Sequence, residues 1–188
     1  MDIDLYIREL RHTLTVVECN HDIWRAYKIK ETRSLYVDTM NSYDLFFSTS
    51  IHAHFVSLLV GLYRLYENRD DTYNIPFLLK KLKAESLFSD DKLELLDGIY
   101  KEEAKPLWIK VCILRNKAFG HRSVAYTVEE VFSEAEVTRD ELRKLVDVTK
   151  KLLNELMYAW NKSSYDFDFS PCEDLLRMLE DLKSCRRL

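Results

Sequence analysis

Apolar side chains recur every three or four residues along most of this chain, the spacing that places them on one face of an α-helix. Long amphipathic helices are predicted over residues 3–30, from residue 42 to about 67, and from 138 to about 161. Shorter helices are predicted over residues 76–83, from 89 to the region of 120, and over 171–185. Residues 31–42 are polar and mixed, and we interpret them as a connection with at most one turn of helix.

Three predicted helix starts carry a capping box, in which a Ser or Thr and a Glu three residues later exchange hydrogen bonds with the backbone. They begin at Thr127, Thr138 and Ser170. Ser42 is a further candidate N-cap. Pro106 falls inside a helical region, so its ring must either kink that helix or begin a new one. The residues predicted to face the core include Leu10, Leu14, Val17, Phe47, Leu58, Leu62, Leu65, Leu145, Leu152 and Leu156.

Glycine and proline are scarce, with three of each among 188 residues, which argues against a turn-rich β fold. The chain is 47% hydrophobic and 32% charged, an ordinary balance for a soluble protein. Its length suffices for one domain with a sizeable core. We therefore predict an all-α fold, with a single helical-bundle domain over residues 1–188 made of long antiparallel helices and additional short ones.

The net charge of −4 excludes a generally basic nucleic-acid coat protein. The region from residue 101 to 122 differs, because six cations there outnumber two glutamates. A local basic patch suits a phosphate-bearing ligand, although a solvated helix face has the same composition. The six cations are Lys101, Lys105, Lys110, Arg115, Lys117 and Arg122.

No residue spacing indicates a metal or another cofactor, and we predict none. His52 and His54 are two positions apart, so on a helix they point about 200° from each other and cannot easily share one ion. We expect His54 to face inward and His52 to face solvent. The cysteines show no CxxC pairing and are predicted to be free thiols in a reducing compartment. They are Cys19, Cys112, Cys172 and Cys185.

The amino-terminal residues are charged and lack the apolar core of a signal peptide. No apolar run approaches the roughly 20 residues needed to cross a bilayer. We therefore expect a cytoplasmic protein that has no membrane partner.

The most distinctive stretch is residues 107–123, which combines an apolar helix with an arginine, a glycine and a histidine. Arg115 lies on a predicted helical face with apolar neighbours, where a charge is costly without a partner or a water-filled cleft. Asn116 follows it directly. Gly120 stands where a left-handed residue would end the helix. Ending the helix there would let His121 turn back, so the spacing predicts that Arg115 and His121 meet.

The same residues also fit a simpler interpretation. His121 would then be a surface histidine after an ordinary helix cap, and Arg115 would extend along the edge of the core with its charge in water. The pattern alone favours neither interpretation.

Residues 115–121, with the sequence RNKAFGH, resemble the signature of HEPN domains, in which an Arg is followed by a polar Asn or Asp and soon afterwards by a His. The wider stretch from Trp108 to Ser123 is similar to the AbiU-like branch of that superfamily, which is linked to abortive phage infection. The specific match covers these residues, and the rest of the chain agrees in being helical and of suitable length.

The resemblance implies a HEPN-like helical bundle that pairs as a homodimer and acts as a metal-independent endoribonuclease. The Arg and His of both copies would line a cleft at the interface. Arg115 would hold the phosphate, His121 would transfer the proton, and Asn116 would position one of them. Lys117 and Arg122 are further candidates for binding the RNA substrate. RNA supplies its own nucleophile, the 2′-hydroxyl, so no metal-bound water is required.

A toxin of a phage-defence system implies an antitoxin protein as a partner. Some toxin members of the superfamily carry a tyrosine two residues after the histidine, which a partner nucleotidyltransferase modifies. Ser123 occupies that place here and the nearest tyrosine is Tyr126, so we do not expect this mode of inactivation.

Two other functions remain open. The first is a non-catalytic HEPN-like module that binds nucleotide, RNA or a partner protein in the same cleft, and the second is a purely structural partner protein. Tyr63, Tyr66 and Tyr126 are candidates for stacking on nucleobases, with packing at the edge of the core as the alternative.

Overall fold

The computed structural model of the chain describes residues 2–120 and 127–185, and over these residues the fold is all-α, as predicted. Two short segments are π-helical, with hydrogen bonds from residue i to i+5. In chain order the elements are α1 (Ile3–Lys28), α2 (Lys30–Ser42), α3 (Asp44–Tyr66), α4 (Ile75–Ala84), α5 (Asp90–Gly98), η1 (Ile99–Ala104), α6 (Lys105–Leu114), η2 (Arg115–Gly120), α7 (Val128–Ala135), α8 (Arg139–Asn161) and α9 (Pro171–Cys185).

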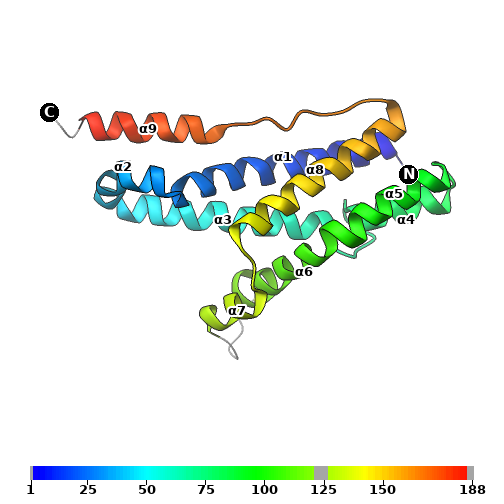
Figure 1. Ribbon diagram of the computed structural model, residues 1–188, viewed down its shortest axis with the longest axis horizontal. Coiled ribbons are helices and arrows are strands. Elements are labelled where there is room, and N and C mark those ends of the chain that lie inside the picture. Colours follow the sequence, from blue (N-terminus) through cyan, green and yellow to red (C-terminus); the bar gives the residue numbers. More distant parts are fainter. Residues whose placement is uncertain (1, 121–126, 186–188) are drawn as a thin grey trace.

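The long helices α1, α3 and α8 form the body of the bundle, and α9 lies along α1 and α2 on one side (Figure 1). An extended segment leads from the end of α8 back to α9. Helices α4 and α5 lie at one end of the bundle, and α6 continues from α5 through η1 and leads away from the bundle to η2 and α7 (Figure 1). The candidate site is carried by this last group, which packs against α3.

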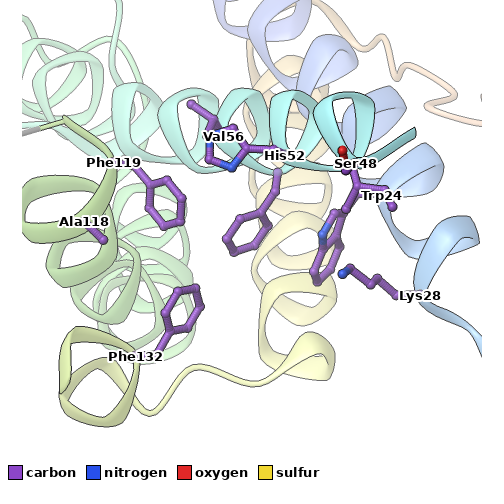
Figure 2. Close-up of a pocket in the computed structure, with 10 residues that line it drawn as sticks. Trp24, Lys28, Ser48, His52, Val56, Ala118, Phe119 and Phe132 are labelled. Atoms are coloured by element: carbon purple, nitrogen blue, oxygen red, sulfur yellow. The ribbon is translucent and has the colours of Figure 1, made fainter. Parts of the chain in front are cut away.

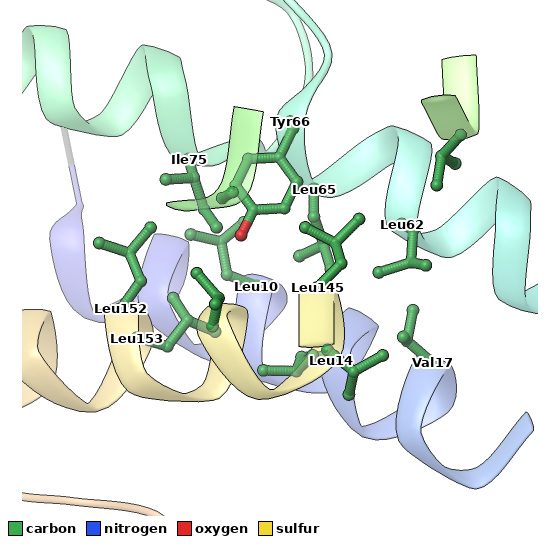
Figure 3. Close-up of a cluster of buried hydrophobic side chains, with 14 of the residues drawn as sticks. Leu10, Leu14, Val17, Leu62, Leu65, Tyr66, Ile75, Leu145, Leu152 and Leu153 are labelled. Carbon is green, nitrogen blue, oxygen red and sulfur yellow. The ribbon is translucent and has the colours of Figure 1, made fainter. Parts of the chain in front are cut away.

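The core lies between α1, α3 and α8, and its stripe of apolar side chains is the one that the periodicity predicts. Helices α1 and α3 approach closely at Gly61, where an added β-carbon would lie 2.4 Å from Cγ2 of Val17. The hydroxyl of the fully buried Tyr66 lies 2.7 Å from Oγ1 of Thr149 on α8. Figure 3 shows Leu10, Leu14, Val17, Leu62, Leu65, Tyr66, Ile75, Leu145, Leu152 and Leu153 meeting in this core.

The prediction of a connection over residues 31–42 is wrong, because α2 is a full helix of 13 residues. Its buried residues include Tyr36 and Met40, which join a second apolar cluster with Leu175 and Leu179 of α9. The residues that make α2 helical therefore lie far away in the chain. A weakly amphipathic segment becomes a helix here because tertiary packing outweighs its local propensity.

Ser42 does not cap α3, contrary to the prediction. It is the last residue of α2, its hydroxyl donates to the carbonyl oxygen of Asp38, and α3 begins after Tyr43 without a side-chain cap. The capping boxes at Thr127 and Thr138 are both present, with reciprocal bonds to the residues three positions later. Sequence therefore identified these two helix starts, whereas the caps at Asp2 and Asn74, which accept from the backbone N–H groups of Leu5 and Phe77, were not predicted.

Both π-helical segments flank α6. The first, η1, ends just before Pro106, which lies in the first turn of α6, directly after Lys105 donates its N–H to the carbonyl oxygen of Tyr100. The second, η2, begins at Arg115 and includes Gly120. The backbone stays helical from Gly98 through Lys105, so Pro106 neither ends the helical run nor starts a separate one, and the helix widens to π-type hydrogen bonding just before it.

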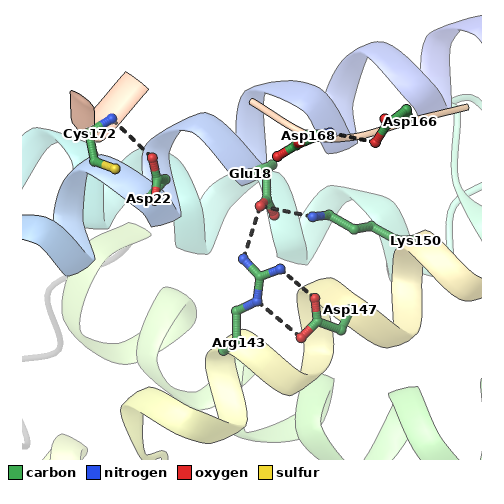
Figure 4. A network of polar contacts seen from close by, with 8 residues as sticks. All are labelled: Glu18, Asp22, Arg143, Asp147, Lys150, Asp166, Asp168 and Cys172. Carbon is green, nitrogen blue, oxygen red and sulfur yellow. Dashed lines mark hydrogen bonds and ion pairs between the residues drawn. The ribbon is translucent and has the colours of Figure 1, made fainter. Parts of the chain in front are cut away.

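A buried carboxylate ties α1 to α8 (Figure 4). Glu18 is 5% exposed, and its Oε1 accepts from Nη1 of Arg143 at 2.9 Å and lies 2.8 Å from Nζ of Lys150. Arg143 also pairs with Asp147 one turn along α8. Oε2 of Glu18 is buried without a partner. Glu18 lies beside Leu14 and Val17 of the predicted apolar stripe, and the sequence pattern gave no sign of this network.

One helix in the described ranges is an exception to the expectation that no segment could span a bilayer. By length and composition alone α3 is long and apolar enough to do so, and 22% of its most apolar window is buried. Its inner face packs on α1 through residues such as Leu58 and Leu62. Its outer face exposes Leu45 and Phe46, with relative exposures of 82% and 61%.

Candidate functional site

Arg115 is the first residue of η2, at the point where α6 widens into a π-helical turn. Its Nη1 donates to Oδ1 of Asn116 at 2.9 Å. Its Nε is buried without a hydrogen-bond partner, and no described carboxylate pairs with the guanidinium. π-helical turns occur frequently at functional sites, and an uncompensated, partly buried cation is a candidate for binding an anion.

The ring of Tyr63 on α3 holds Arg115 in place. The guanidinium carbon lies 4.4 Å from the ring centre, which is a cation–π contact. Trp108, two turns earlier on the same helical face, lies with its ring centre 6.2 Å from that of Tyr63 and donates its Nε1–H to the Tyr63 carbonyl oxygen. Tyr63 is therefore a positioning residue for Arg115, in contact with both ends of the α6 face. From sequence, Tyr63 was a candidate for base stacking or for packing at the edge of the core, and its support of Arg115 was not predicted.

The other predicted site residues fall into two groups. Asn116 is exposed beside Arg115, and Lys117 pairs through Nζ with both carboxylate oxygens of Glu134 on α7, at 2.6 Å each. His121 and Arg122 lie outside the described residues, and so does the predicted meeting of His121 with Arg115. The structure therefore describes the Arg–Asn half of the predicted constellation.

Cys112 lies one turn before Arg115, and burial raises the pKa of its thiol to about 12, an effect that the charge of Arg115 only partly offsets. A thiol with that pKa stays protonated near neutral pH and is a poor nucleophile. All four cysteines are free in the described structure.

The predicted basic patch around the motif is largely neutralised by carboxylates. Lys101 pairs with Asp97, and Lys110 pairs with Glu141, whose pKa is lowered by that bond. Lys117 pairs with Glu134. Among the described cations of this region, Arg115 and Lys105 have no ion-pair partner. The sequence showed the excess of charge but could not show which cations were already compensated.

A pocket of about 710 Å³ opens beside η2 (Figure 2). Its walls come from α1, α3, η2 and α7, and the rings of Trp24, Phe119 and Phe132 face the same hollow (Figure 2). The residues that line it are Trp24, Lys28, Ser48, Ile51, His52, Phe55, Val56, Ala118, Phe119 and Phe132.

His52 is exposed, as predicted, and it also lies at this pocket, with its ring centre 5.9 Å from that of Phe119. His54 is half-buried; burial lowers its pKa, and its Nδ1 lies 2.8 Å from Oδ1 of Asn20. Sequence reasoning placed both side chains correctly but gave no sign of the pocket, because its other walls come from distant elements. Within residues 2–120 and 127–185 no three His, Cys, Asp or Glu side chains are grouped to hold a metal ion.

Tyr66 cannot stack on a nucleobase, contrary to the suggestion from sequence, because it is fully buried and bonded to Thr149. Tyr126 lies outside the described residues. His21 is also buried, and its Nδ1 has no hydrogen-bond partner among the described residues.

An all-helical bundle with an Arg–Asn pair on the turn that follows an apolar helix is the arrangement expected of the HEPN class. A family model of that class, described as AbiU2, matches residues 2–175. The chain therefore belongs to the AbiU2 family of HEPN domains and is an abortive-infection-related HEPN module, as the sequence resemblance implied. No curated protein and no solved structure matches the chain.

Proposed function

We propose that this chain is a metal-independent endoribonuclease of a phage-defence or toxin-type system and that it acts as a homodimer. One observation carries the proposal: the guanidinium of Arg115 is held by Tyr63 and Asn116, has no carboxylate partner among the described residues, and belongs to the turn that walls the aromatic pocket. A fixed, uncompensated arginine suits a phosphodiester, because paired hydrogen bonds can hold it and stabilise its developing charge.

The proposed reaction is a transesterification within the RNA strand. The 2′-oxygen forms a bond to phosphorus while the bond from phosphorus to the 5′-oxygen breaks. His121 takes the proton from the 2′-hydroxyl, and a second proton reaches the leaving 5′-oxygen from His121 of the other copy. Arg115 holds the non-bridging oxygens, and Asn116 positions Arg115. The products are a 2′,3′-cyclic phosphate and a 5′-hydroxyl.

Lys117 and Arg122 are proposed as further substrate-binding residues. Lys117 can contribute only when its pair with Glu134 opens or is shared, because both carboxylate oxygens now accept from it. We also propose a cytoplasmic location and an antitoxin protein as a partner, since a free ribonuclease would damage the RNA of its own cell.

The outer face of α3 supports a homodimer. Leu45, Phe46 and Ala53 are exposed there, and a soluble protein rarely leaves such an apolar face uncovered. Ser48 and His52 lie within one turn of these residues and also line the aromatic pocket. Pairing two copies through α3 would therefore bring both pockets next to one symmetric seam.

The test is cleavage of mixed cellular RNA in the presence of a chelator by the wild-type chain and the variants His121→Ala and Arg115→Ala. Both variants should lose cleavage while keeping the wild-type melting temperature. Arg177→Ala, on the exposed side of α9, is the matched control and should cleave normally. His52→Ala is a second histidine control.

The outcomes separate the alternatives. Cleavage by His121→Ala together with its loss in His52→Ala would show that the proton carrier is misassigned. RNA binding that Arg115→Ala removes, without cleavage by the wild type, would indicate a non-catalytic binding module. Effects on folding alone would indicate a structural protein.

A further inference from the structure

The pocket beside η2 is built from aromatic rings that come from four elements. The ring centres of Phe55 and Phe119 are 5.5 Å apart with planes nearly perpendicular, and Phe132 lies 6.1 Å from Phe119 in the same relationship. Trp24 stacks on Phe55 with centres 5.0 Å apart. These rings present both faces and edges to the hollow between them (Figure 2).

These rings are not sealed in the core. Phe132 is 38% exposed, and Phe55 and Phe119 are half-buried, whereas core residues such as Leu58 on the same helix as Phe55 are fully buried. A half-exposed aromatic cluster around an open hollow leaves apolar ring surface in water, and a flat apolar ligand could cover that surface.

The rim of the pocket carries positive charge without a counterion. Lys28 is exposed at the end of α1, and in the part of the chain that the structure describes no carboxylate pairs with it. His52 lines the same pocket from α3 (Figure 2). A cation beside aromatic rings matches a ligand that joins a flat ring to an anionic group.

The pocket is continuous with the candidate site. Phe119 follows Arg115 by four residues on η2, and both pack on α3, Arg115 against Tyr63 and Phe119 against Phe55. A strand held at Arg115 by one phosphate would therefore pass the mouth of the pocket.

We infer that this pocket binds a nucleobase of single-stranded RNA next to the phosphate held by Arg115, with Phe119 and Phe132 stacking on the base and Lys28 contacting a neighbouring phosphate. The inference rests on the proposed function for the identity of the strand. It adds a requirement for an unpaired base, because a base inside a duplex cannot enter the pocket.

The experiment measures binding of the full-length protein to a short, fluorescein-labelled single strand with 2′-O-methyl riboses, which cannot be cut because the 2′-oxygen is blocked. A strand with the same backbone but no bases serves as the second probe. Phe132→Ala should bind the base-containing strand about tenfold more weakly, since stacking on an aromatic side chain contributes that much per base. It should bind the abasic strand as the wild type does.

Lys28→Ala should weaken binding of both strands, because it removes a phosphate contact. Phe132→Tyr keeps the ring and should bind like the wild type. Tyr158→Ala and Lys144→Ala, exposed positions on α8 away from the pocket, are the matched controls and should change neither affinity. The melting temperature of each variant shows whether it is folded.

Wild-type affinity of Phe132→Ala for the base-containing strand would overturn the inference, and so would an equal loss on the abasic strand or no binding of either strand by the wild type. Failure of the proposed function has a different signature. Ordinary RNA would then stay intact with the wild type, while the base-dependent effect of Phe132→Ala would persist.

Discussion

Arg115 and Tyr63 form a cation–π pair across the joint between η2 and α3, with 4.4 Å between the guanidinium carbon and the ring centre. Tyr63 also contacts Trp108, ring against ring, and accepts the Trp108 Nε1–H at its carbonyl oxygen. One residue of α3 therefore fixes the direction of α6 and the arginine at its end. The position of the candidate site therefore depends on a residue that never needs to touch the substrate.

This pair predicts that Tyr63→Leu lowers RNA cleavage without unfolding the protein. Losing the ring removes about 1 kcal/mol of cation–π attraction and frees the guanidinium, and small displacements of a catalytic group cost up to about 100-fold in rate. Tyr63→Phe keeps the ring and should retain nearly full activity. Single-turnover cleavage rates and thermal melting of both variants test this; equal losses in the two variants would contradict it.

The close approach of α1 and α3 predicts opposite effects for two glycine substitutions. Gly61→Ala forces a β-carbon to within 2.4 Å of Val17 and should destabilise the fold by about 1–3 kcal/mol. Gly98→Ala meets no atom within 4 Å and has helical backbone angles, so it should stabilise by about 0.5–1 kcal/mol. Urea unfolding gives both values. If the clash is the cause, the double variant Gly61→Ala/Val17→Ala should lose less stability than the two single variants lose when their losses are added.

His21 predicts a loss of stability in acid. Burial, reinforced by the charges of Arg143 and Arg25, lowers its pKa from 6.5 to about 4. Below pH 6.5 the unfolded chain takes up a proton that the folded chain refuses, so stability falls as the pH falls toward 4. At 1.36 kcal/mol per pH unit, the loss reaches roughly 3 kcal/mol at pH 4.

The measurement compares the free energy of unfolding at pH 7 and pH 4.5 in the wild type and in His21→Gln. The variant should lose less stability on acidification, because its side chain does not titrate. His12→Gln, at an exposed position on α1, is the matched control and should keep the wild-type dependence. An unchanged dependence in His21→Gln would refute the assignment.

The buried carboxylate of Glu18 predicts different results for two adjacent lysines. Lys150→Ala removes one of two cations from that carboxylate and should cost about 2 kcal/mol, less than the roughly 3–5 kcal/mol for a fully orphaned buried charge because Arg143 remains. Lys151 pairs with Glu103 at the surface, so Lys151→Ala should cost less than about 1 kcal/mol. The free energies of unfolding of the two variants, measured with denaturant, test this. Similar losses in both would mean that the network around Glu18 contributes little.

The outer face of α3 predicts that Leu45→Glu or Phe46→Glu converts a dimer into a monomer. The new carboxylate would be desolvated in the seam, while in a monomer it would simply stand in water. Leu95→Glu, at a position 47% exposed on α5, is the control and should leave the mass unchanged. Light scattering coupled to size-exclusion chromatography gives the mass. A monomeric wild type, or dimers in all variants, would count against this interface.

The contrast between α8 and α2 explains how much of the fold the sequence could predict. α8 has a capping box at Thr138 and a strong apolar stripe, so its start and inner face are encoded locally. α2 lacks a side-chain cap and depends on Leu175 and Leu179, more than 130 positions later. The apolar periodicity of the sequence identifies a helix that has its own apolar face and N-cap. It misses a helix that is stabilised by a partner distant in the sequence.

The candidate site shows the same division. Arg115 and Asn116 were found because a charge interrupts an apolar stripe. The π-helical turn, the support from Tyr63 and the pocket around Phe119 and Phe132 were not found, because each depends on how separate helices meet.

The tie between Glu18 and Arg143 joins residues 125 positions apart, and Trp160 reaches back in the same way to donate to Asp4. Helix α1 therefore lacks the partners of this face until α8 has been synthesised. Non-local closure of this kind slows folding and exposes the nascent chain to aggregation. A prematurely terminated product would lack the second half of its own core, so a truncated message should yield an insoluble or degraded fragment and no partly active one.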